Sequence, residues 1–249
     1  MRYALSLTIV LALAFAVAAC EGGSSTTAAL LPNGDGGVYL ALGDSIADGE
    51  GASDREATDY VAQVYEALQS RYGASLQLES LAVGGHTTQD LIDQQLGPAV
   101  ALIEGGDVRA VTITIAGNDL YVLANDPVCP TEPASPDCPF EDIIAETEKR
   151  LNAVLRELRA AGPDTPIVIE VYPNLFSGTG NAFEEPAEYS FGRLNEVIEA
   201  VADDHDVLIA DPRDGFEGRA TEVTAPNFHP NDPGYEIIAA AFLEVLGLQ

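Results

Sequence analysis

The chain has 249 residues, 47% of them hydrophobic, and its 40 Asp and Glu against 11 Lys and Arg give a formal charge of −29 at pH 7. This length suits one compact α/β domain or two small ones, and the hydrophobic content excludes wholesale disorder. The excess of acid excludes nucleic acid as a partner, and it excludes docking on an anionic membrane through a basic patch.

Residues 1–19 are predicted to be an export signal rather than part of the fold. A short basic start precedes an almost continuous apolar run, which is shorter than the roughly 20 residues that span a bilayer as a helix. The run ends in Val17-Ala18-Ala19-Cys20, and small residues in this position are typical of signal-peptidase cleavage. The tetrapeptide also resembles the lipobox of bacterial lipoproteins, in which the cysteine is lipidated. The alternative is ordinary cleavage after Ala19, which gives a freely secreted protein.

The cysteine count favours lipidation. In an oxidising compartment Cys129 and Cys138 can pair with each other, and this leaves Cys20 over. We therefore expect a disulfide between Cys129 and Cys138 and a lipid anchor at Cys20 that holds the protein at the cell membrane or envelope. Residues 20–36 are rich in small and polar residues and are predicted to be a flexible tether. The folded domain is then residues 37–249.

Strand-like and helix-like segments alternate from Val38 onward. Apolar runs typical of buried strands lie at residues 38–42, 76–83, 108–115, 167–171 and 207–210. Helical spacing of apolar residues is found at 60–72, 87–96, 143–158, 191–201 and 235–246. Strands that alternate with helices in this way indicate right-handed crossovers and a parallel sheet with helices on both faces. The sequence therefore predicts one α/β/α sandwich domain with a five-stranded parallel sheet.

Ligands of such sheets bind at the carboxyl ends of the strands, so the residues that follow each strand are informative. Four polar or glycine-rich blocks lie there or just before the last helix: Gly43-Asp44-Ser45, Gly84-Gly85-His86-Thr87, Gly117-Asn118-Asp119 and His229-Pro230-Asn231. In this order they resemble the blocks of the SGNH, or GDSL-type, serine esterases and lipases, and the resemblance covers nearly the whole chain after the tether. It implies a flavodoxin-like α/β/α fold and ester hydrolysis without a cofactor.

Each block holds one group that acyl transfer needs. Ser45 is the predicted nucleophile, and His229 is the predicted base, since imidazole can take and return a proton near neutral pH. The backbone N–H groups of Ser45 and Gly85 and the side-chain amide of Asn118 are the predicted oxyanion-hole donors. Taken singly, each residue could be a helix cap or a turn residue. Their coincidence in the family order favours the catalytic interpretation.

One position departs from the family pattern. An aspartate usually lies three residues before the catalytic histidine and orients its ring, whereas this chain has Pro226 there. A backbone carbonyl or a carboxylate from elsewhere could orient His229, or Ser45 and His229 could act as a bare pair. The sequence does not choose among these, so no third residue is assigned. The departure also leaves an alternative function open, that of a non-hydrolytic surface binding protein which retains the fold.

The expected activity is that of an exported serine ester hydrolase that forms an acyl-enzyme. The chain shows no histidine or cysteine cluster with metal-ligand spacing and no phosphate-binding or dinucleotide motif, so no metal or cofactor is predicted. The sequence does not decide whether the substrate is a lipid ester, an acylated polysaccharide or a small soluble ester. Two segments, residues 125–140 and 173–190, could form a substrate lip or be passive surface loops.

Overall fold

A parallel sheet of five strands forms the centre of the computed structural model, which describes residues 31–249. The strands lie in the spatial order β2-β1-β3-β4-β5, and all four ladders are parallel. Their bounds are β1 (Gly37–Gly43), β2 (Leu76–Ser80), β3 (Val108–Thr114), β4 (Ile167–Glu170) and β5 (Leu208–Ala210). The predicted five-stranded parallel sheet is thus confirmed.

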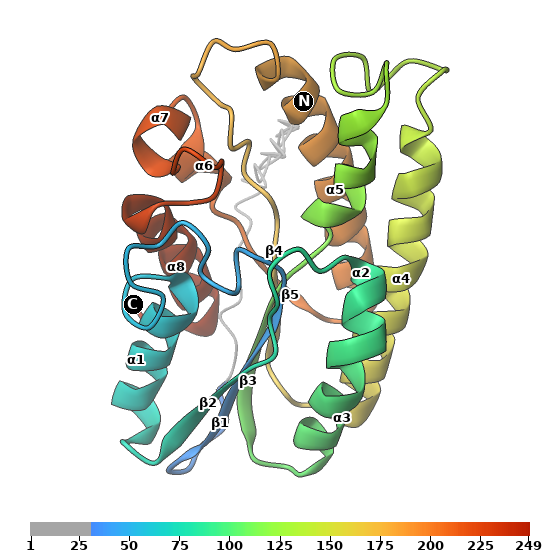
Figure 1. Cartoon of the computed structure of the whole chain (residues 1–249). Helices are drawn as coiled ribbons and strands as arrows, with labels where there is room; N and C mark the ends of the chain where they lie inside the picture. Colours follow the sequence, from blue (N-terminus) through green and yellow to red (C-terminus); the bar gives the residue numbers. More distant parts are fainter. Residues whose placement is uncertain (1–30) are drawn as a thin grey trace, which may run out of the picture.

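Helices cover both faces of this sheet (Figure 1). On one face α1 (Tyr60–Tyr72) packs against α8 (Asp232–Leu246); on the other, α4 (Phe140–Ala161) packs between α3 (Leu96–Glu104) and α5 (Glu184–Asp204). The inner strands are therefore buried on both sides, and β4 is buried at every residue. Burial on two sides explains why the strands are continuous apolar runs rather than alternating patterns.

Short helices complete the connections. They are α2 (Thr88–Asp90), the π-helix η1 (Leu91–Gln95), the 3₁₀ helix η2 (Gly117–Asn125), α6 (Arg213–Phe216) and α7 (Ala220–Val223). The first two run directly into α3, so the predicted helix that starts near Thr87 is one continuous segment to Glu104. The other three were not predicted, because helices of four to nine residues are too short to show a clear apolar period.

Helix α5 begins seven residues before the predicted start at residue 191. Its first turn contains Glu184, Glu185 and Pro186, and acidic side chains and proline are both favoured in a first turn. Residues 184–190, which were expected to belong to a long loop, are therefore helical. The loop after β4 ends at Phe183.

The segment before β1 contacts the domain. Tyr72 Oη donates a hydrogen bond of 2.9 Å to the Pro32 carbonyl, and Arg109 Nε donates one of 2.8 Å to the Gly36 carbonyl. The end of the predicted tether is thus bonded to the domain. The predicted signal at residues 1–19 and the lipidation site Cys20 lie outside the described residues. Within residues 31–249, no helix is long and apolar enough to cross a membrane.

Candidate active site

Ser45 and His229 lie together, although 184 positions separate them in the sequence. Ser45 is in the turn that follows β1, and His229 is in the segment that leads into α8. The distance from Ser45 Oγ to His229 Nε2 is 2.8 Å, which is that of a hydrogen bond from a hydroxyl to an imidazole nitrogen. This geometry allows the imidazole to accept the serine proton as Oγ attacks a carbonyl carbon.

A backbone carbonyl faces the other ring nitrogen of His229. Nδ1 lies 3.2 Å from the Asn227 carbonyl oxygen, so Nδ1–H donates and Nε2 is left to accept from Ser45. The chain turns back on itself here because Phe228, between the two residues, has a φ of 64°, in the left-handed region. Such a conformation costs a bulky residue on the order of 1–3 kcal/mol. Of the alternatives for orienting the ring, the structure shows the backbone carbonyl.

The sequence did not single out Glu50, whose carboxylate lies beside the same histidine. Glu50 Oε2 is 3.7 Å from His229 Nε2, and Glu50 Oε1 accepts a hydrogen bond of 3.2 Å from Asn227 Nδ2. The Glu50 backbone is held by Ser45 and by Tyr235, through bonds of 2.8 Å each. When His229 takes a proton, the Glu50 carboxylate is close enough to pair with the charged ring. Among forty acidic residues, no local signal distinguishes this one.

The predicted oxyanion donors come from the loops after β1, β2 and β3. A Cβ on Gly84 would lie 3.9 Å from Ser45 Cβ, so the Gly84-Gly85 turn packs against the serine. Within residues 31–249, neither the Ser45 N–H nor the Gly85 N–H donates to a protein acceptor. Asn118 Nδ2 donates one hydrogen to the His86 carbonyl at 3.0 Å, and a primary amide has a second hydrogen to donate. The arrangement can therefore present donors to a negative oxygen.

Gln95, which the sequence also did not single out, joins the first two of these loops. Its Oε1 accepts from the Gly43 N–H at 2.9 Å, and its Nε2 donates to the Gly43 carbonyl at 2.8 Å. The same Nε2 lies 2.9 Å from His86 Nδ1. Gly43 has a φ of 142°, and a side chain there would collide with the Thr114 carbonyl of β3. The buried amide and the glycine together fix the end of β1, and with it the turn that holds Ser45.

Asp119 anchors the third loop. Its carboxylate accepts from the Thr88 N–H at 2.8 Å and from Thr88 Oγ1 at 2.5 Å, and Arg150 lies 3.4 Å away. The start of η2 is thereby tied to the start of α2 and to α4. Asp119 belongs to one of the sequence blocks, and the structure gives it the role of holding Asn118 in place.

A buried acid lies next to Ser45 in the sequence. Asp44 accepts hydrogen bonds from Tyr172 Oη at 2.7 Å and from the Ile46 N–H at 3.0 Å. Burial raises the pKa of Asp44 to about 7, although these two bonds oppose the shift. Behind it, burial raises the pKa of Glu170 to about 8, and Thr114 Oγ1 is its partner at 2.6 Å. The turn that holds Ser45 thus rests on two carboxyl groups that resist ionisation.

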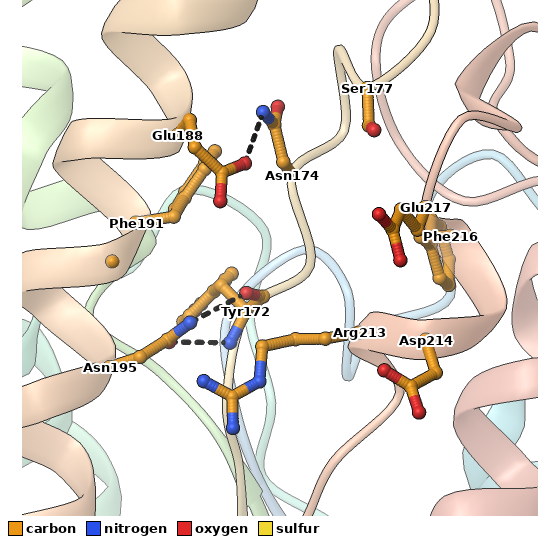
Figure 2. Close-up of a pocket in the computed structure, with 11 residues that line it drawn as sticks. Tyr172, Asn174, Ser177, Glu188, Phe191, Asn195, Arg213, Asp214, Phe216 and Glu217 are labelled. Atoms are coloured by element: carbon orange, nitrogen blue, oxygen red, sulfur yellow. Dashed lines mark hydrogen bonds between the residues drawn. The ribbon is translucent and has the colours of Figure 1, made fainter.

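A polar cavity of about 370 Å³ lies between the loop after β4 and helices α5 and α6 (Figure 2). The Asn195 side chain accepts a hydrogen bond from the Tyr172 N–H and donates one to the Tyr172 carbonyl, both of 2.8 Å. Asn174 Nδ2 donates a hydrogen bond of 2.9 Å to the Glu188 carboxylate. Arg213 pairs with acidic side chains beside the cavity. These polar groups are engaged within the protein and hold the loop after β4 against α5.

Two further expectations concern the cysteines and metal binding. Cys129 and Cys138 form the predicted disulfide. No group of three or more His, Cys, Asp or Glu that could hold a metal ion occurs in the part of the chain that the structure describes.

Comparison with known families identifies the chain. A model of the GDSL-like Lipase/Acylhydrolase family matches residues 41–237, a range that contains all four sequence blocks. The chain belongs to this family. The GDSL-like fold and the class of carboxylic ester hydrolase, which the resemblance implied, are thereby confirmed. A comparison with curated proteins found no match.

Solved structures of three enzymes share the fold. An acetylxylan esterase from Geobacillus stearothermophilus is 22% identical, with a TM-score of 0.65 over 86% of this chain and 95% of the other. A lipase from a goat rumen metagenome is 19% identical, with a TM-score of 0.68 over 84% and 96%. A phospholipase A1 from Streptomyces albidoflavus is 24% identical, with a TM-score of 0.61 over 85% and 98%. At these identities the likeness is one of architecture.

Proposed function

We propose that this GDSL-like hydrolase cleaves esters through an acyl-enzyme formed on Ser45. The observation that carries the proposal is the 2.8 Å hydrogen bond between Ser45 Oγ and His229 Nε2, at the edge of the sheet where the four sequence blocks meet. A serine hydroxyl is a weak nucleophile until an adjacent base takes its proton, and this bond supplies the base.

The first half of the reaction forms the acyl-enzyme. Ser45 Oγ attacks the carbonyl carbon of the ester while its proton passes to His229 Nε2. The negative charge that develops on the carbonyl oxygen is stabilised by the N–H groups of Ser45 and Gly85 and by the Asn118 amide. His229 then returns the proton to the alcohol oxygen, the carbon–oxygen bond breaks, and the alcohol leaves.

The second half regenerates the enzyme. A water molecule loses a proton to His229 Nε2 and attacks the acyl carbon, and the same donors stabilise the second oxyanion. Collapse of this intermediate releases the carboxylic acid and returns the proton to Ser45 Oγ. Through both halves, the Asn227 carbonyl keeps the ring oriented, and the Glu50 carboxylate is close enough to pair with its protonated form.

This function is tested by hydrolysis of p-nitrophenyl esters. We expect Ser45→Ala and His229→Ala each to lower kcat at least about a thousandfold, and the double variant to be little worse, because residues that act as a unit are not additive. Ser70→Ala and His205→Ala, which lie away from the site, are the matched controls. Retention of activity by His229→Ala would contradict the mechanism.

We also propose that the protein is exported and lipid-anchored at the cell membrane or envelope. The support is Val17-Ala18-Ala19-Cys20 together with the pairing of the other two cysteines with each other. The anchored enzyme should partition into a detergent phase, whereas Cys20→Ser should not mature normally. If both forms stay equally in the aqueous phase, the anchor is absent.

A further inference from the structure

An apolar groove of about 410 Å³ opens beside Asn118. One wall comes from η2 and from the loop that the disulfide closes, residues 129–138, and it includes Leu123, Cys129 and Pro130. The other wall comes from the loop after β4 and the start of α5, and it includes Phe176 and Ala187. Apart from Asn118, Ser190 and the Tyr121 hydroxyl, the lining consists of apolar side chains and glycine, and it contains no charged residue. In a chain with 40 acidic residues, an uncharged groove of this size is a specific feature.

Three phenylalanine rings connect the groove with the Ser45–His229 pair. The Phe176 ring lies 6.1 Å from that of Phe183 and 4.8 Å from that of Phe228, measured between centroids. Phe228 immediately precedes His229, and yet it is 50% exposed, as Phe183 is 47% exposed. Because Phe176 lies between them, these exposed rings form one contiguous apolar surface, and such surfaces are typical of ligand-binding grooves.

The exposed apolar side chains gather at this edge of the sheet. Within residues 31–249, the large hydrophobic residues that remain exposed all lie in segments after β2, β3 or β4 or before α8: Val83, Tyr121, Val122, Phe183 and Phe228. No other edge of the described domain carries such residues. Large exposed apolar side chains of the described domain are therefore confined to the edge of the sheet that carries Ser45 and His229.

The geometry of the reaction decides which part of an ester enters the groove. The leaving alcohol oxygen must face His229 Nε2 in order to receive its proton. The surroundings of Nε2 are polar, because Glu50 Oε2 lies 3.7 Å away and Glu50 Oε1 accepts a hydrogen bond from Asn227 Nδ2. The carbonyl oxygen must face the donors, which include Asn118. The remaining substituent of the carbonyl carbon is the acyl chain, and the apolar lining begins at Asn118.

We propose that the groove binds the acyl chain of the substrate, so that the enzyme prefers esters of medium-chain fatty acids to acetate esters. This inference rests on the proposed hydrolase function and narrows its substrate class. Each methylene buried in an apolar site raises affinity about fourfold. A groove of about 410 Å³ is far larger than the single methyl group of an acetyl ester needs.

The disulfide makes one wall of the groove rigid. Cys129 lines the groove, the bond to Cys138 closes the loop, and Phe140, at the start of α4, forms part of the lining just beyond it. The Asp126 side chain accepts from the Cys129 N–H at 3.0 Å and fixes the loop from the other end. A preformed groove binds a flexible chain with less loss of conformational freedom than a mobile loop would.

Two isomeric esters test the assignment directly. Ethyl octanoate carries the long chain on the acyl side and octyl acetate carries it on the alcohol side, and acid release from both can be followed at constant pH. We expect kcat/KM for ethyl octanoate to exceed that for octyl acetate at least about tenfold, since bound apolar surface contributes to kcat/KM. Equal values, or faster hydrolysis of octyl acetate, would overturn the proposal.

Variants of the groove provide the second arm. Ala187→Phe fills the groove, and we expect the ratio of kcat/KM for p-nitrophenyl octanoate to that for the acetate to fall at least about tenfold. Ala200→Phe is the matched control, since Ala200 is an exposed residue of the same helix about 20 Å farther along it. The control should leave the ratio unchanged.

A milder change covers the case in which Ala187→Phe does not fold. Phe183→Ser removes an exposed ring of the groove and should lower the same ratio, whereas Ala101→Ser, at an exposed position of α3 outside the lining, should not. An unchanged ratio with Ser45-dependent hydrolysis of both esters would refute the acyl groove and leave the hydrolase function standing. Loss of Ser45 dependence would instead refute the hydrolase function.

Discussion

At the scale of single residues, the orientation of His229 explains how the chain dispenses with the usual aspartate. The Nδ1–H of a neutral imidazole needs one acceptor to hold the ring in the tautomer that serves as base. The Asn227 carbonyl, 3.2 Å from Nδ1, is such an acceptor, and the left-handed turn at Phe228 brings it there. Pro226 therefore does not leave the ring without a partner. The contact supplies the acceptor whose absence from position 226 had left a non-hydrolytic binding protein as an alternative.

A substitution at position 226 tests this role of the carbonyl. Because Nδ1 already has an acceptor, we expect Pro226→Asp to change kcat/KM for p-nitrophenyl acetate by less than about threefold relative to Pro226→Asn. The asparagine variant has nearly the same shape without the charge, so the comparison isolates the carboxylate. A gain of tenfold or more in the aspartate variant would show that the wild-type ring lacks a proper orienting group.

At the scale of elements, a buried carboxyl group at the end of β4 lies behind the turn that holds Ser45, and it lowers the stability of the folded domain as pH rises. Glu170, the last residue of β4, is fully buried, and its Oε1 has no hydrogen-bond partner within residues 31–249. Burial raises the pKa of Glu170 to about 8, from an ordinary value of 4.5. The folded state therefore binds this proton more tightly than the unfolded state does. Between about pH 4.5 and pH 8, the contribution of Glu170 to the free energy of unfolding falls as pH rises.

Replacement of this carboxyl by an amide should remove that pH dependence. At pH 9 we expect Glu170→Gln to have a free energy of unfolding about 1–3 kcal/mol above that of the wild type, because no buried charge has to form. The difference should shrink toward pH 5, where the wild-type carboxyl is protonated when folded. Denaturant titrations at both pH values measure it, with Glu79→Gln on the exposed part of β2 as control. A difference that is the same at both pH values would contradict the assigned pKa.

The elements differ in how far the sequence predicted them. Strands β1, β3 and β4 were predicted nearly to the residue, because burial on both faces leaves a continuous apolar run. The start of α5 was missed since its first turns are acidic and partly exposed, and they show no apolar period. The short helices α6 and α7 were missed for lack of length. The apolar period of a sequence arises from the burial of one face, so an element that buries few side chains shows no clear period and is not predicted from it.

At the scale of the whole molecule, the parallel topology carries the residues of four distant blocks to one edge of the sheet (Figure 1). The sequence could predict this, because the carboxyl ends of parallel strands always share an edge. It could not predict Gln95 or Glu50, whose residue types are common on helices and surfaces. Their contacts reach across 52 positions from Gly43 and 177 positions from Asn227, and such pairings follow only from the packed fold.

The central claim is that His229 activates Ser45 as a nucleophile, and covalent labelling tests it most directly. A fluorophosphonate reacts with an activated serine, and mass spectrometry of the digested protein locates the adduct. We predict one adduct at Ser45 in the wild type, none in Ser45→Ala, and labelling slowed at least about a hundredfold in His229→Ala. Labelling of His229→Ala at the wild-type rate, or an adduct on another residue in place of Ser45, would contradict the account.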